Sequence, residues 1–99
     1  MRITKVEPIV LKVQLEGNQQ FAYSQAWYDS RVLMILRIET DAGITGWGEA
    51  FGPAFVHKAI IESVYAPMIT GMDPMDTTVI WETLYNRLQD HGQKGVCIE

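Results

Sequence analysis

Two carboxylates in the stretch TDAGITGWGEAFGP, residues 40–53, are the first groups whose spacing could support chemistry. A carboxylate can act as a metal ligand, as a general base, or as an acceptor for backbone N–H groups. Asp41 is most simply a turn residue. Glu49 has no second acid placed near it in the sequence. We therefore expect a structural role for Glu49, as an anchor of its strand.

The other reactive side chains do not form a catalytic set. His57 and His91 lie at the ends of predicted helices without a partner at metal-ligand spacing, so each is expected at the surface or at a helix end. Cys97 is the sole cysteine, which excludes an internal disulfide, and no Cys/His pair marks it as a nucleophile. The glycines near Trp47 do not lead into a helix that carries Lys and Ser/Thr, so they form no phosphate loop. The sequence thus predicts no catalytic residue and no metal ligand within this chain.

Two aromatic segments have the composition of a binding surface. Aromatic rings with polar tips provide apolar contact area together with hydrogen-bonding groups. The alternative is that these rings only cover a sheet. We favour binding because the second segment, 51–55, is expected beside the first, 17–30. The candidate binding residues are Phe21, Tyr23, Ser24, Trp27, Tyr28, Phe51 and Phe55.

Three strands are expected ahead of the helices. In residues 3–16, Ile9, Leu11, Val13 and Leu15 alternate with more polar residues, and this period of two predicts a strand with those four on its apolar face. Pro8 indicates an edge strand or a bulge, and a bulge that swaps faces would explain the opposite phase of Val6 and Val10. Residues 31–40 are apolar on both faces over their first half, which predicts a central strand.

A turn and a third strand complete an antiparallel meander. Asp41 and Gly43 supply the turn, because glycine readily adopts positive φ. Residues 44–50 form the third strand, in which Gly46 and Gly48 flank Trp47. Glycines within a strand often mark a close approach of neighbouring backbone, and we expect one here.

Two helices follow the strands. Val56, Ile60, Val64 and Met68 recur every four residues, but Pro67 is expected to kink or end that helix near residue 66. The second helix is predicted over 73–92, with Asp73 as its N-cap and Gly92 after its last turn.

The overall composition narrows the class of protein. The net charge is −4, with no basic run, which argues against a nucleic-acid partner. No apolar run is long enough to span a bilayer, and the N-terminus lacks a signal-peptide core. We expect a cytoplasmic protein without a membrane partner. The apolar residues 96–98 at the end predict that the chain is cut from a longer protein.

Two motifs together now show a resemblance to a known family. They are Thr40-Asp41-x-Gly43-x-x-Gly46-Trp47-Gly48-Glu49-Ala50 and Gly71-x-Asp73-Pro74. In order and spacing the whole chain resembles the N-terminal capping domain of the enolase superfamily, in the branch of mandelate racemase and muconate lactonizing enzyme.

The resemblance implies a fold and a set of partners. The fold would be α+β: a three-stranded antiparallel meander over about 1–51, helices over about 54–92, and the start of a connection over about 93–99. This single capping domain would pack on the family's (β/α) barrel, which is absent from this chain. The barrel would carry the Mg²⁺ ligands and the catalytic bases, so this chain itself would hold no metal. Homo-oligomers are expected.

The resemblance also implies a function. The family removes the proton α to a carboxylate, and two loops of the cap shape substrate choice. They match 18–28 and 50–55 here. A structural role is implied for Asp41, Gly43, Gly46, Trp47, Gly48, Glu49 and Asp73. The expected parent enzyme is a sugar-acid dehydratase, with a racemase or cycloisomerase as the alternative. The 99-residue chain alone would be inactive. A stand-alone, non-catalytic binding or assembly module is the competing hypothesis.

Overall fold

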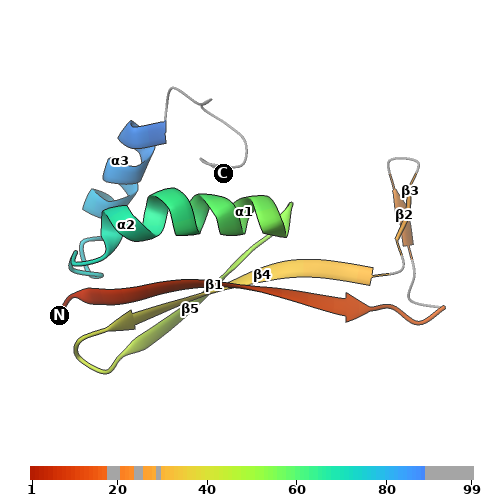
Figure 1. The fold of residues 1–99 in the computed structure, drawn as a ribbon, viewed down its shortest axis with the longest axis horizontal. Helices are drawn as coiled ribbons and strands as arrows, with labels where there is room; N and C mark the ends of the chain where they lie inside the picture. Colours follow the sequence, from red (N-terminus) through yellow and green to blue (C-terminus); the bar gives the residue numbers. More distant parts are fainter. Residues whose placement is uncertain (18–20, 24–25, 29, 89–99) are drawn as a thin grey trace.

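A three-stranded antiparallel sheet lies under a layer of helices in the computed structural model of this chain (Figure 1). The structure describes residues 1–17, 21–23, 26–28 and 30–88. Strands β1 (Ile3–Gln14), β4 (Ser30–Thr40) and β5 (Thr45–Ala50) form the sheet in the order β1-β4-β5. The central strand is therefore β4, as its two apolar faces predicted, and the expected meander is confirmed.

A short hairpin is inserted between the first two strands of this sheet. It consists of β2 (Phe21–Tyr23) and β3 (Ala26–Tyr28), which form a separate two-stranded sheet. The hairpin stands beyond the far ends of β1 and β4, away from α3 (Figure 1).

One helical segment covers the sheet, although its geometry changes along its length. It runs through α1 (Ala54–Ile60), the π-helical turn η1 (Ile61–Tyr65) and α2 (Ala66–Ile69). In η1 the N–H of Ala66 bonds to the carbonyl of Ile61, five residues back. This wider turn lies directly before Pro67, whose ring would clash with the carbonyl four residues back in an α-helix. Of the two predicted outcomes, an end near residue 66 is therefore wrong: the helix changes its geometry before Pro67, passes it and ends after Ile69.

The last helix begins later than the sequence predicted. Asp73 accepts a bond from the N–H of Met75 at 2.9 Å and forms a turn, not the N-cap of the helix. Helix α3 spans Thr77–Leu88, and its first turn is preceded by Asp76, whose carbonyl accepts the N–H of Ile80. The sequence Asp-Pro is a good turn former as well as a helix start, and the turn prevails. The predicted stop at Gly92 lies outside the described residues.

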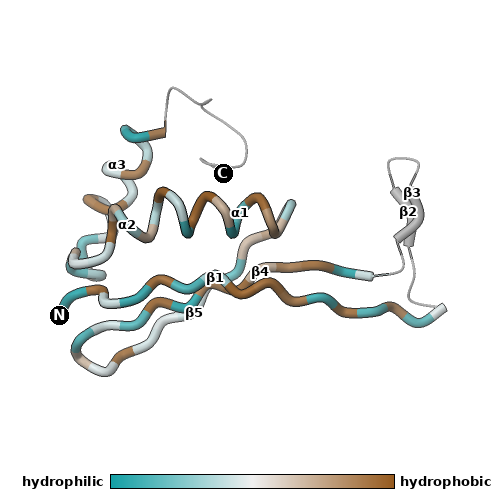
Figure 2. Tube along the Cα trace, in the orientation of Figure 1, coloured by the Kyte–Doolittle hydropathy of each residue, from teal (hydrophilic) through white to brown (hydrophobic). Residues whose placement is uncertain are grey.

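The core lies between the sheet and α1–η1. Met34, Ala54 and Ile61 are buried, and apolar residues of β1, β4, β5 and η1 pack around them. Figure 2 shows apolar residues along α1 and along the middle of β1 and β4, where the two layers meet. No helix among the described residues is long and apolar enough to cross a bilayer.

The face of β1 that meets this core is not the predicted one. Val10 pairs with Met34 in the register and packs against the core, whereas Leu11 and Val13 are 41% and 52% exposed. The register shift lies between Ile3 and Lys5, not at Pro8, so no bulge swaps the faces there. Pro8 is tolerated because β1 is an edge strand, which was the other predicted possibility.

The start of β1 is hydrogen-bonded to two later segments of the chain. Ile3 exchanges backbone hydrogen bonds with Gly71 and Met72, at 2.8 and 2.9 Å. The N–H of Arg2 bonds to Oδ1 of Asp41 at 2.8 Å, and the N–H of Asp41 bonds back to the carbonyl of Arg2 at 3.0 Å. We call these contacts the N-terminal clasp. It fastens β1 to the β4–β5 turn and to the segment that follows α2.

Candidate functional site

The first aromatic segment forms a hairpin, where the sequence predicted a loop. In its ladder Phe21 pairs with Tyr28, and Tyr23 with Ala26. The connection Ser24-Gln25 has none of the Gly, Asn or Asp residues typical of a tight hairpin turn, so the sequence offered no turn signal. Aromatic residues before and after that connection were the available indication of strands. Ser24 itself lies outside the described residues.

The second segment, from Phe51 to Phe55, joins β5 to α1 and presents two aromatic rings. Phe51 is 89% exposed and Phe55 is 69% exposed. Between them Ala54 is 4% exposed and belongs to the core. The carbonyl of Pro53 accepts the N–H groups of both Val56 and His57 at 3.0 Å, which starts the helix. The backbone is thus fixed while the two phenylalanine rings remain available for contact.

An open recess lies on the helix side of the sheet, between α1 and the ends of β1 and β4 that lead to the hairpin. Its volume is about 550 Å³. The side chains of Pro8, Val10, Val32 and Phe55 provide apolar lining. The recess therefore touches the second aromatic segment and the strands that carry the first, and it is large enough for a small molecule.

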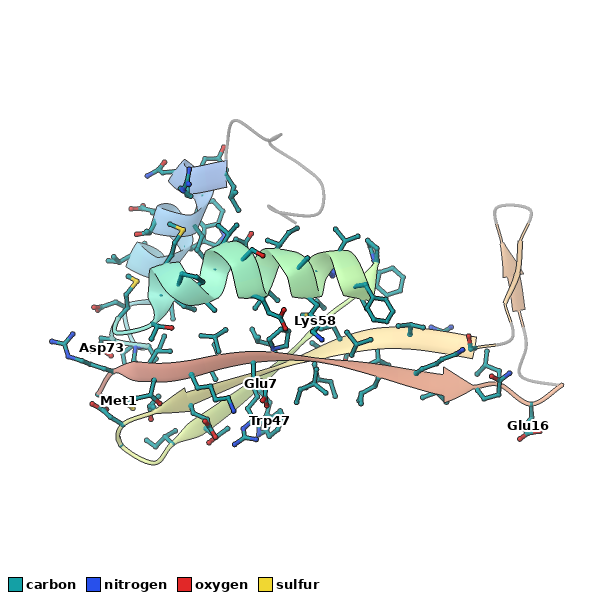
Figure 3. All side chains as sticks on the ribbon, viewed as in Figure 1. Met1, Glu7, Glu16, Trp47, Lys58 and Asp73 are labelled. Carbon is teal, nitrogen blue, oxygen red and sulfur yellow. The ribbon has the colours of Figure 1, made fainter. Side chains whose placement is uncertain are left out.

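Two lysines stand at this recess. Lys58 points from α1 toward the sheet (Figure 3) and lies 3.8 Å from Glu62. Lys12 lines the recess from β1, and its ammonium group makes no hydrogen bond or ion pair with the described residues. Glu7 also lines the recess, but its carboxylate pairs with Lys5 at 3.1 Å. Apolar walls with nearby ammonium groups suit a small ligand that carries a carboxylate. Sequence reasoning missed Lys12, Val32 and Lys58, which belong to no motif and come together only in the fold.

The structure confirms some of the predictions about structural residues and contradicts others. Gly43 has φ of 77° and permits the β4–β5 turn, as predicted. Asp41 does more than turn the chain, because it also holds the N-terminal clasp. The close approach expected at Gly46 and Gly48 is wrong, since a Cβ atom at either position would meet no atom within 4 Å.

Trp47 and Glu49 lie on the side of the sheet away from the helices. Trp47 is visible there in Figure 3, is 65% exposed, and has the guanidinium of Arg37 5.8 Å from its ring centre. Arg37 also bonds to Glu39 and lies 3.8 Å from Glu7. Glu49 is exposed, and its carboxylate makes no hydrogen bond or ion pair with any described residue, so its expected role as an anchor stays a prediction.

The described part of the chain holds no group of three His, Cys, Asp or Glu residues placed to bind a metal ion. The single carboxylates near the recess are too few for a Mg²⁺ site, which needs oxygen ligands in a closely defined geometry. These residues can contact a ligand.

Comparison with known families decides the identity of this domain. Residues 5–92 match the model of the N-terminal domain of mandelate racemase and muconate lactonizing enzyme. The chain belongs to this family. It is therefore an enolase-superfamily capping domain, with the α+β fold that the sequence motifs predicted.

Individual members of the superfamily match along most of the domain. The chain is 37% identical over 98 residues to D-galactarolactone cycloisomerase of Agrobacterium fabrum, covering 99% of this chain and 25% of the relative. It is 41% identical over 54 residues to D-galactonate dehydratase of Ralstonia nicotianae, covering 52% of this chain and 14% of the relative. The crystal structure of 3,6-anhydro-D-galactonate cycloisomerase from Zobellia galactanivorans matches with a TM-score of 0.81 and 32% identity, over 98% of this chain and 24% of that one.

The capping domain thus spans about a quarter of the length of such relatives. In full-length relatives it is paired with a C-terminal barrel. Relatives of this domain include both cycloisomerases and sugar-acid dehydratases.

Proposed function

We propose that this domain is the substrate-capping and specificity domain of a Mg²⁺-dependent enzyme that removes the proton α to the carboxylate of a sugar acid or its lactone. The observation that carries the proposal is the recess on the helix side of the sheet, next to the second aromatic segment. Phe55 lines it, and Lys12 and Lys58 offer cationic groups to an acidic ligand.

The role of these residues is to bind and orient the ligand and to exclude water. Phe51 and Phe55 are exposed on a fixed backbone, so they can pack on a ligand at little cost in side-chain entropy. Closing an active site with such groups strengthens electrostatic interactions inside it. In the proposed enzyme the hairpin residues Phe21, Tyr23, Ser24, Trp27 and Tyr28 close the other side of the ligand.

The family depends on Mg²⁺ in general, but the donor set of the described residues does not fit the ion. We place the metal ligands and the bases in a C-terminal barrel partner. No step of the reaction is assigned to residues of this domain.

Two outcomes of proton removal are candidates for the parent reaction. The composition of the two loops favoured dehydration, and dehydratases match about half of this chain. Cycloisomerisation is supported by a relative that matches 99% of it. We give cycloisomerisation preference, because that similarity extends over nearly the whole chain.

The test uses the full-length enzyme that carries this domain, assayed with Mg²⁺ on D-galactarolactone and on D-galactonate. We expect Phe51→Ala and Phe55→Ala each to raise KM about tenfold, because both rings would lose their contact with the ligand. Val79→Ala is the matched control, since Val79 is 52% exposed on α3, away from the recess. Unchanged kinetics in both phenylalanine variants would contradict the capping role of this segment.

A further inference from the structure

The side chain of His57 lies against the backbone of Gly52 inside the second aromatic segment. A Cβ atom built on Gly52 would lie 2.9 Å from Cε1 of His57 and 3.3 Å from its Nε2, closer than real side chains approach. Gly52 also has φ of 125°, a conformation that other residues rarely adopt. The imidazole ring therefore occupies the space that any other residue at position 52 would need.

His57 does not serve in the surface or helix-capping role that the sequence suggested. Helix α1 has no side-chain cap, and His57 is half-buried. Its Nδ1 atom is buried without a hydrogen-bond partner in the described part of the chain. A buried nitrogen without a partner is unfavourable, so this ring does not lie here for its hydrogen bonds.

The backbone N–H of His57 fixes the same segment from the other side. It donates to the carbonyl of Pro53, the residue directly after Gly52. His57 thus holds Gly52 by its ring and Pro53 by its backbone. Phe51, which precedes these two residues, is 89% exposed and has little packing of its own to fix its direction.

We infer that His57 is a positioning residue, whose ring packs on Gly52 and thereby sets the direction in which Phe51 is presented to the ligand. The inference rests on the proposed function, because it takes the segment from Phe51 to Phe55 to be part of the cap. The role needs a flat ring of this size at position 57. It does not need Nδ1, because that atom makes no hydrogen bond with the described residues.

The direct test is NMR spectroscopy on the 99-residue protein. The wild type should show a nuclear Overhauser effect between Hε1 of His57 and Hα of Gly52, and backbone order parameters of about 0.85 at Phe51 and Gly52. His57→Ala should lower those two order parameters below about 0.6. His57→Phe should restore them, which a role in hydrogen bonding would not allow.

Two controls make the result specific. Val56→Ala changes the neighbouring residue of α1, which is 46% exposed, and should leave the order parameters at Phe51 and Gly52 unchanged. Order parameters in β4 report whether the variants are folded. Absence of the Overhauser effect in the wild type, or unchanged mobility of Phe51 in folded His57→Ala, would overturn the inference.

Kinetics of the full-length enzyme separate this inference from the proposed function. With D-galactarolactone or D-galactonate as substrate, His57→Ala should raise KM about tenfold and His57→Phe should return it to within about twofold of the wild type. If the order parameters fall in His57→Ala but KM does not change, the positioning role of His57 stands and the capping role of the segment fails. If KM rises in His57→Ala without any loss of order at Phe51, the positioning role fails instead.

Discussion

The two faces of β1 differ in their contribution to stability, and one pair of valines measures the difference. Val10 packs against the core, while Val13 on the same edge strand is 52% exposed. We predict that Val10→Ala lowers the free energy of unfolding more than Val13→Ala does. Both changes remove the same methyl groups and the same strand propensity, so their difference isolates burial.

The magnitude follows from the buried area. Each buried methyl-sized group contributes about 0.8 kcal/mol, so Val10→Ala should cost about 1.5 kcal/mol. Val13 is already half exposed, which limits the cost of Val13→Ala to about 0.8 kcal/mol. The difference of about 0.7 kcal/mol corresponds to about 3–6 °C in Tm for a domain of this size.

Urea unfolding followed by tryptophan fluorescence provides the assay. The unfolding curves must not depend on protein concentration. Association through the exposed face of the sheet would bury Val13 and increase the cost of Val13→Ala. Equal losses for the two variants, or a larger loss for Val13→Ala, would refute the assignment of the faces and place the core on the side that the alternating pattern predicted.

Three further predictions concern the turn, the clasp and the isolated chain. Gly43→Ala should lower the free energy of unfolding by about 1 kcal/mol, because φ is 77° at this position. Gly46→Ala should change it by less than about 0.5 kcal/mol, because a Cβ atom there would have open space around it. Equal effects of the two variants in thermal unfolding would refute this. Asp41→Ala should cost about 1 kcal/mol by removing the bond from Arg2, and an unchanged Tm would contradict that role. The 99-residue chain should not convert D-galactonate in the presence of Mg²⁺, because its described residues form no metal site; product detected by mass spectrometry would show otherwise.

Elements specified by local sequence were predictable. The Asp41–Gly43 turn depends on residues that favour positive φ, and the central strand follows from apolar residues on both faces. The resemblance carried by the residues around Trp47 identified the family and therefore the topology.

Features for which the sequence allowed two packing arrangements were not predictable. Both faces of β1 carry apolar residues. The face that meets α1 is set by the pairing of Val10 with Met34, and not by the alternation of apolar and polar residues along the strand. The glycines beside Trp47 could mark either close packing or open space, and the fold leaves open space.

The recess could not be predicted from the sequence, because its residues come together only in the fold. It combines Lys12 of β1, Val32 of β4 and Lys58 of α1, which are distant in the sequence and belong to no motif. The packing of His57 on Gly52 was also missed, because helical spacing alone indicated a surface or capping residue.

The N-terminal clasp has a consequence for the order in which this domain folds. Arg2 and Ile3 bond to partners at positions 41, 71 and 72, so these two residues obtain their hydrogen bonds only after most of the domain has been made. Contacts between residues so distant in sequence close slowly, because the intervening chain must first be ordered. During synthesis the outer edge of β1 therefore remains unpaired at Ile3. This edge is where the unfinished domain is most exposed to pairing with a strand of another chain.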